Sequence, residues 1–183
     1  MLIVLSGPSG VGKNRMLSIA AAQLGWAPIV PVTTRARRSD EVHGEDYYFT
    51  PRDEFRRRIK QGDFAEWDYA IRNYYGCLRS VEGVAEAPGV SIMHALSRIA
   101  LRLRQRLPGV VPVYLRPESL SELNLRLHAR ANVDDDELTL RYEHWLEEQE
   151  HSSLFEYVIP AAEKLSPEDT VRRLQDIAGA HGA

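Results

Sequence analysis

The glycine-rich segment GPSGVGK, at residues 7–13, restricts the fold of this chain more than any other part of it. It fits the pattern G-x-x-x-x-G-K, in which glycines let backbone N–H groups converge on phosphate oxygens and the lysine reaches the outer phosphates. The pattern has this meaning only between a strand and a helix. Residues 2–5 are apolar and predict a buried strand, and residues 13–24 predict a helix that ends near Gly25. The residues predicted to bind phosphate are Gly7, Ser9, Gly10, Val11, Gly12, Lys13 and Asn14.

The residue after Lys13 departs from the usual pattern. A serine or threonine at this position gives its hydroxyl to Mg²⁺, and this chain has Asn14 instead. An amide oxygen can ligate Mg²⁺ or hold one of its waters, so Asn14 is a predicted weak magnesium ligand. We expect nucleotide binding to survive this change, with a cost to metal geometry and turnover.

Composition narrows the class of protein. The chain has 183 residues, 44% of them hydrophobic and 27% charged, which predicts one folded, water-soluble domain. Its net charge of −3 does not favour a nucleic-acid partner. Cys77 is the only cysteine, so an intramolecular disulfide is excluded and a reducing compartment is indicated. The apolar start, residues 1–5, is too short for a signal peptide or a membrane span, and we expect a cytoplasmic protein without a membrane partner.

Apolar runs alternate with amphipathic stretches, a rhythm that predicts an α/β fold with a parallel central sheet flanked by helices. The segment from 33 to 80 differs, because it is polar and rich in Arg and Tyr. It predicts short strands and one helix, which Thr50 caps, which begins at Pro51 and which ends at about Gln61. An inserted subdomain is therefore predicted. The remaining predicted strands are 29–32, 90–93, 110–115 and 155–159. The remaining predicted helices are 97–106, one that starts at 117–119, one from 134 and one from 166.

Three arginines gather after the second predicted strand. Arg35, Arg37 and Arg38 are followed by Glu41 and by Asp46 with two tyrosines. Guanidinium groups clustered in this way are suited to bidentate recognition of an anion. By contrast, His43, His128, His144 and His151 lack metal-ligand spacing and are predicted to be surface or helix-end residues.

Four motifs occur in order and at compatible spacing: GPSGVGK, then TTRxxRxxEVxGxDYxF from residue 33, GxFxEW from residue 62 and NYYG from residue 73. Together they resemble the guanylate kinase family, densely over residues 2–76 and more weakly over 116–157. The resemblance implies a P-loop kinase fold with an inserted acceptor-binding subdomain and a helical lid. The implied divisions are a core of 1–32, 81–125 and 142–183, an acceptor-binding subdomain of 33–80 and a lid of 126–141.

The same resemblance implies a reaction, the transfer of the ATP γ-phosphoryl group to GMP with Mg²⁺. Glu66 would read the guanine, because a carboxylate accepts two parallel N–H bonds that adenine cannot offer. Phosphoryl transfer depends on positioning and charge neutralisation rather than on a covalent nucleophile. The implied catalytic residues are Lys13 and the lid arginines Arg126, Arg130 and Arg141. The implied acceptor-binding residues are Arg35, Arg38, Glu41, Tyr47, Glu66, Tyr75 and Cys77.

Two other interpretations remain open at this stage. The family's Asp-x-Asp-x-Gln-Gly pattern is replaced here by HALSR at residues 94–98. This segment, the arginine-rich helix after it and VVPV at 110–113 are similar to ribose 1,5-bisphosphate kinases, whose substrate carries phosphates but no base. Noncatalytic guanylate-kinase-like modules, which bind GMP or protein ligands, are the third possibility.

Overall fold

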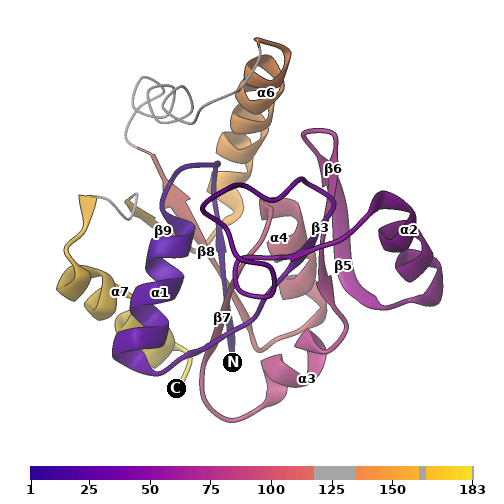
Figure 1. Cartoon of the computed structure of the whole chain (residues 1–183). Helices are drawn as coiled ribbons and strands as arrows, with labels where there is room; N and C mark the ends of the chain where they lie inside the picture. Colours follow the sequence, from indigo (N-terminus) through magenta and orange to yellow (C-terminus); the bar gives the residue numbers. More distant parts are fainter. Residues whose placement is uncertain (118–134, 161–163, 183) are drawn as a thin grey trace.

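The computed structural model describes residues 1–117, 135–160 and 164–182. Its centre is a five-stranded sheet in the order β2-β7-β1-β8-β9, in which every neighbouring pair is parallel. The predicted parallel sheet flanked by helices is confirmed (Figure 1). The strands of this sheet are β1 (Leu2–Ser6), β2 (Ala27–Pro28), β7 (Ser91–His94), β8 (Val110–Arg116) and β9 (Tyr157–Pro160). The helices are α1 (Lys13–Leu24), α2 (Arg52–Gln61), α3 (Val81–Glu86), α4 (Ser97–Arg106), α6 (Asp135–His151) and α7 (Pro167–Ala180), with a 3-10 turn η1 (Ser152–Leu154).

Strand β1 is buried on both faces, which explains its uninterrupted apolar sequence. Successive side chains of a strand point to opposite faces, so Ile3 and Leu5 belong to one core and Leu2 and Val4 to the other. The first core includes side chains of α1 and α7, which lie side by side on one face of the sheet (Figure 1). The second includes side chains of α3 and α4. The result is a three-layer α/β/α arrangement. None of the helices in the described ranges is long and apolar enough to cross a membrane.

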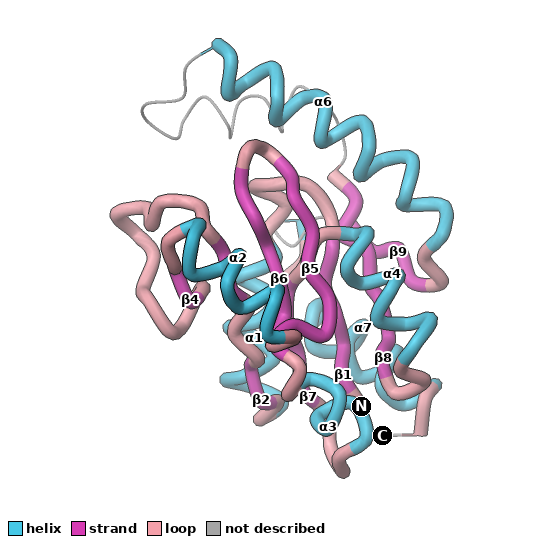
Figure 2. Tube along the Cα trace, turned by 90° about the vertical axis from the view of Figure 1, so that its right-hand side faces the viewer, coloured by secondary structure: helices cyan, strands magenta, loops and turns pink. Residues whose placement is uncertain are grey.

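A second, smaller sheet arises from the segment rich in Arg and Tyr. Its order is β4-β3-β6-β5, with β5 and β6 forming an antiparallel hairpin (Figure 2). Phe55 of α2 stacks on Phe64 at 4.3 Å between ring centroids, and both pack with Val32 in a small separate core. The strands are β3 (Val32–Thr33), β4 (Tyr48–Phe49), β5 (Phe64–Ala70) and β6 (Asn73–Leu78).

Two local predictions were wrong in detail. Residues 29–32 do not form one strand: Ile29 N still donates to Ile92 O at 2.8 Å, and the chain then crosses to the second sheet. Pro31 lies at this crossing and has no N–H to give to a ladder. Helix α2 begins one residue later than expected, with Pro51 extended as its N-cap. Thr50 does not cap it: Thr50 directly follows β4, and its N–H bonds Thr33 O of β3 at 2.9 Å.

Helix α6 is tied to the start of α4 by a buried carboxylate. Glu148 is 1% exposed and accepts from the Ser97 backbone N–H at 3.1 Å and from the Ser97 hydroxyl at 2.5 Å. A carboxylate at a helix N-terminus also complements the positive end of the helix dipole. This contact holds the second half of α6 at the carboxyl edge of the sheet, where ligands of α/β proteins bind.

Candidate active site

The glycine-rich loop connects β1 to α1, as the sequence pattern requires. Gly7 has a φ of +127°, and a Cβ on it would lie 2.5 Å from the Leu115 carbonyl oxygen, so only glycine fits against β8. Gly12 ends the loop as the left-handed N-cap of α1, whose first turn carries no acidic residue. The positive end of the α1 dipole therefore faces the loop, which favours an anion there.

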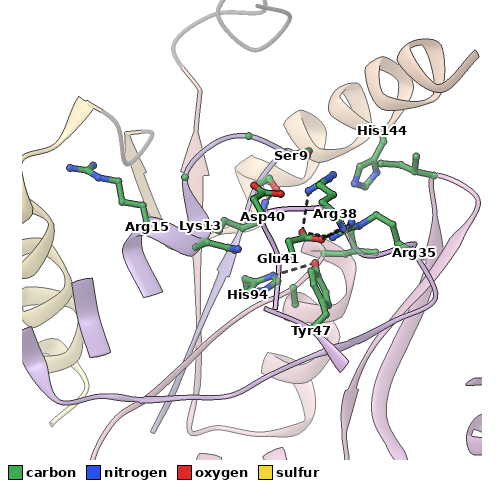
Figure 3. A pocket seen from close by; sticks show the side chains of 17 residues that line it. Ser9, Lys13, Arg15, Arg35, Arg38, Asp40, Glu41, Tyr47, His94 and His144 are labelled. Carbon is green, nitrogen blue, oxygen red and sulfur yellow. Dashed lines mark hydrogen bonds and ion pairs between the residues drawn. The ribbon is translucent and has the colours of Figure 1, made fainter. Parts of the chain in front are cut away.

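Lys13 lies folded over this loop. Its Nζ donates to the carbonyl oxygens of Gly7 at 2.5 Å and Pro8 at 2.9 Å. These bonds keep the ammonium group beside the glycines, where it can exchange carbonyl oxygens for phosphate oxygens. The side chain also borders the main cavity (Figure 3).

A cavity of about 320 Å³ brings the predicted donor and acceptor residues together. Its size falls within the range of small-molecule sites. Figure 3 shows side chains of the loop, of the arginine segment and of β7 converging on this space. One cavity therefore borders both groups of predicted phosphate-binding residues. The predicted residues that line it are Gly7, Ser9, Gly10, Gly12, Lys13, Asn14, Arg35, Arg38, Glu41 and Tyr47.

Glu41 organises the arginines on the acceptor wall. Its carboxylate accepts two bonds from the Arg35 guanidinium, at 2.6 and 3.0 Å, and one from the Arg38 backbone N–H at 2.9 Å. The Arg38 guanidinium lies 3.3 Å from the same carboxylate. Burial opposes ionisation of Glu41, but these hydrogen bonds outweigh it and hold its pKa below the ordinary value. We call Arg35 and Arg38, held by the Glu41 carboxylate, the arginine fork; it is charged and preorganised. The guanidinium carbon of Arg35 also lies 5.5 Å from the centroid of the Tyr47 ring.

His94 is a site residue that the sequence analysis recorded only as a missing aspartate. It is 5% exposed, with Nδ1 at 3.4 Å from the Tyr47 hydroxyl and Nε2 at 3.2 Å from the Asp46 carbonyl oxygen. Because a carbonyl oxygen only accepts, Nε2 carries the proton and the tyrosine donates to Nδ1. Its place at the end of β7, paired with Leu5 of β1, is the signal that could have revealed it.

Burial, followed by the charge of Lys13, lowers the pKa of His94 to about 4. An unfolded histidine titrates near 6.5, so between these values the unfolded state binds the proton and the folded state does not. Stability contributed by neutral His94 is therefore complete at neutral pH and is lost as the pH falls from 6.5 toward 4.

From pH 7.5 to pH 5, the wild type should lose about 2 kcal/mol more unfolding free energy than His94→Gln. Urea unfolding of both proteins at the two pH values measures this, with the other histidines common to both; equal losses would contradict a buried neutral His94.

Glu66 and Cys77 lie outside the lining of the cavity in the described part of the chain. The Glu66 carboxylate accepts from Arg102 Nε at 2.9 Å and from Arg106 at 2.8 Å, one guanidinium on each oxygen. Each oxygen has a second lone pair, so the carboxylate retains capacity for two further N–H donors. Cys77 is 1% exposed, its thiol donates to Glu66 O at 3.6 Å, and burial raises its pKa to about 12. This thiol stays protonated.

Two other predicted residues have different surroundings. Tyr75 borders a small hollow of about 10 Å³ that adjoins Tyr47 and Met93, and its ring centroid is 6.2 Å from that of Tyr47. Tyr47 and Tyr75 therefore form one aromatic wall.

The side chain of Val11 is fully buried in the core that includes α1 and α7, so Val11 can offer only its backbone to a phosphate.

The predicted lid falls mostly outside the described residues. Arg126 and Arg130 lie there, and so does the side chain of Arg141, although Arg141 itself is in α6. Helix α6 does reach the cavity through His144, whose side chain is 11% exposed. The prediction that His144 is a surface residue was wrong, because the Glu148 anchor turns this part of α6 toward the site.

The parallel sheet, the loop between its first strand and α1, and the lysine that opens the helix define a P-loop kinase. A shikimate kinase from Bacteroides thetaiotaomicron shares this fold, with a TM-score of 0.56 and 18% identity over 98% of each chain. A family model described as guanylate kinase matches residues 1–180. The chain belongs to the guanylate kinase family.

Relatives in that family cover most of the chain. A guanylate kinase of Chlamydia felis is 38% identical over 165 residues, which are 86% of this chain and 78% of the relative. One from Trichodesmium erythraeum is 33% identical over 179 residues, 96% of this chain and 94% of the relative. The crystal structure of guanylate kinase from Anaplasma phagocytophilum aligns with a TM-score of 0.76 and 28% identity, covering 99% of this chain and 85% of that one.

Proposed function

We propose that this protein transfers the γ-phosphoryl group of ATP to GMP, giving ADP and GDP. One observation carries the proposal: the phosphate loop with Lys13 and the arginine fork on Glu41 face the same cavity. The loop and Lys13 would hold the donor phosphates, and Arg35 and Arg38 would hold the acceptor phosphate. Two anions brought together in this way need the positive charge that both walls supply.

The remaining roles follow from the family resemblance. Tyr47 and Tyr75 would complete the acceptor-phosphate site, and Glu66 would read the guanine. The lid, 126–141, would bring Arg126, Arg130 and Arg141 onto the transferring group, while 33–80 acts as the acceptor-binding subdomain. Closure would exclude water, which would otherwise hydrolyse ATP. We also propose a cytoplasmic location, which the free, buried thiol of Cys77 supports.

The described residues offer few side-chain ligands for Mg²⁺. No cluster of three or more His, Cys, Asp or Glu side chains that could hold a metal lies within the described ranges. Mg²⁺ in phosphoryl-transfer sites usually takes only one or two protein oxygens, with phosphates and waters as its other ligands. The amide oxygen of Asn14 is one such ligand beside the loop. When bound with ATP, Mg²⁺ neutralises phosphate charge.

The test is an assay of ADP release with ATP and Mg²⁺, in which GMP, AMP, ribose 1,5-bisphosphate or no acceptor is supplied. ADP formation that depends on GMP supports the proposal. Turnover only with ribose 1,5-bisphosphate would show that this sugar bisphosphate, and not GMP, is the acceptor. Nucleotide binding without turnover of any acceptor would identify a noncatalytic module.

A second acceptor is favoured by one observation. Glu66 is engaged by Arg102 and Arg106 and lies outside the cavity lining, whereas the phosphate-binding groups line it. A substrate with phosphates but no base would use the lining groups alone. Ribose 1,5-bisphosphate has this chemistry, and the assay above separates it from GMP.

Replacing Glu66 with alanine should lower kcat/KM for GMP about a hundredfold, because two hydrogen bonds to a charged acceptor are lost. Binding of ATP should stay within about twofold of the wild type, since Glu66 is remote from the loop lining. The matched control is Asp68→Ala, which removes a carboxylate from the same arginine cluster, at Arg98 and Arg102. Equal losses with GMP and AMP, or equal losses in the two variants, would refute guanine recognition by Glu66.

A further inference from the structure

A side-chain contact joins the residue after the phosphate loop to the acceptor wall. Asn14, in the first turn of α1, donates from Nδ2 to Asp46 Oδ1 at 2.6 Å. Asp46 lies just before Tyr47, on the loop that enters β4. The residue that replaces the usual magnesium ligand is therefore already in contact with a carboxylate.

Asp46 is held in this position from two sides. Its Oδ2 accepts the backbone N–H of Val42 at 2.8 Å, and its own N–H donates to Val42 O at 3.1 Å. Its carbonyl oxygen lies 3.2 Å from Nε2 of His94, at the carboxyl end of β7. Asp46 thus lies next to two residues that line the cavity, Tyr47 and His94, and its Oδ1 is directed at the start of α1.

Asp46 and Asn14 together place two side-chain oxygens beside the start of α1. Strand β7 ends in Met93 and His94 and is followed by Ala95, and none of these offers a carboxylate. The terminal amide torsion of asparagine is broad and roughly two-fold, so rotation exchanges Nδ2 for Oδ1 at little cost. An amide oxygen beside a carboxylate oxygen is a donor pair that suits Mg²⁺ bound mainly by phosphates and water.

We propose that Asp46, with Asn14, binds the Mg²⁺ of the ATP complex; this inference rests on the proposed ATP-dependent function. The charge of Asp46 then has opposite effects in two conditions. With the metal present, the carboxylate attracts Mg²⁺ and strengthens nucleotide binding. Without the metal, the same carboxylate faces the phosphates and repels them.

The experiment measures the affinity of a non-hydrolysable ATP analogue by calorimetry, once in EDTA and once in saturating Mg²⁺. The ratio of the two dissociation constants reports how strongly the metal promotes binding, and metal binding to the free analogue affects all variants equally. Asp46→Asn keeps the shape and an acceptor for the Val42 N–H. It should reduce this ratio at least about tenfold, the scale of lost metal-site contacts, while binding in EDTA is unchanged or tighter.

Two further variants complete the design. Asn14→Ala, on a different element, should also reduce the ratio. Asp40→Asn removes a carboxylate charge from the lining of the cavity and should leave the ratio within about twofold of the wild type.

The outcomes are distinct. If Asp46→Asn binds the ATP analogue more weakly than the wild type by the same factor with and without Mg²⁺, Asp46 has a purely structural role and the inference is overturned. An unchanged ratio in Asp46→Asn, or a wild type whose binding ignores Mg²⁺, would also overturn it. Metal-dependent binding that fails in Asp46→Asn, together with no turnover of GMP in the separate ADP-release assay, would support the metal site and refute the proposed function.

Discussion

Replacing Lys13 with methionine should lower kcat/KM for ATP by two to three orders of magnitude. Methionine keeps a long unbranched side chain but removes the charge that would follow the phosphates into the transition state. Loss of one preorganised donor to developing charge typically costs about this much. The ADP-release assay with GMP as acceptor measures the effect.

The matched control is Lys60→Met, on the exposed surface of α2. It makes the same chemical change far from the cavity and should retain activity within about twofold. Lys13 also bonds the carbonyls of Gly7 and Pro8, so the thermal midpoint of Lys13→Met should be measured alongside. A variant that stays folded and keeps more than about a tenth of wild-type activity would contradict the role assigned to Lys13.

Arg35→Met should lower kcat/KM for the acceptor about a hundredfold, chiefly by raising KM. The substitution removes a guanidinium that would bind the acceptor phosphate, and charge-assisted contacts of this kind are worth about 2–5 kcal/mol when one partner is truncated. Glu41 keeps Arg38 and a backbone N–H, so the free energy of unfolding should fall by only about 2 kcal/mol. Acceptor-dependent kinetics and urea unfolding test the two effects.

A double variant separates these effects. In Arg35→Met with Glu41→Gln, the buried carboxylate is neutral, and most of the lost unfolding free energy should return without recovery of acceptor binding. Arg37→Met is the control within the same loop, because Arg37 is exposed and, within the described ranges, its guanidinium bonds a backbone carbonyl, that of Glu41 at 2.6 Å, and no carboxylate. An acceptor KM raised equally by Arg37→Met and Arg35→Met would show that general loop damage, and not phosphate recognition, causes the loss.

Local sequence was sufficient for the elements whose stabilising contacts are local. Helices α1 and α4 begin and end where the sequence predicts, and α7 opens at Pro167 with Ser166 accepting the Asp169 N–H at 3.0 Å. The phosphate loop followed from glycine spacing between a strand and a helix. The fork at Glu41 could also be anticipated, because Arg35 and Arg38 lie within six residues of Glu41 along the chain.

Only the tertiary structure decided the contacts made between distant segments. It engages Glu66 with two arginines of α4, joins Asn14 to Asp46 and buries His94 between Asp46 and Tyr47. It also divides residues 29–32 between two sheets and carries His144 to the cavity through the Glu148 anchor. The partners in these side-chain contacts are about 30 to 50 positions apart. Spacing and periodicity describe a residue's near neighbours, so they cannot specify which side chains meet once the strands and helices have packed.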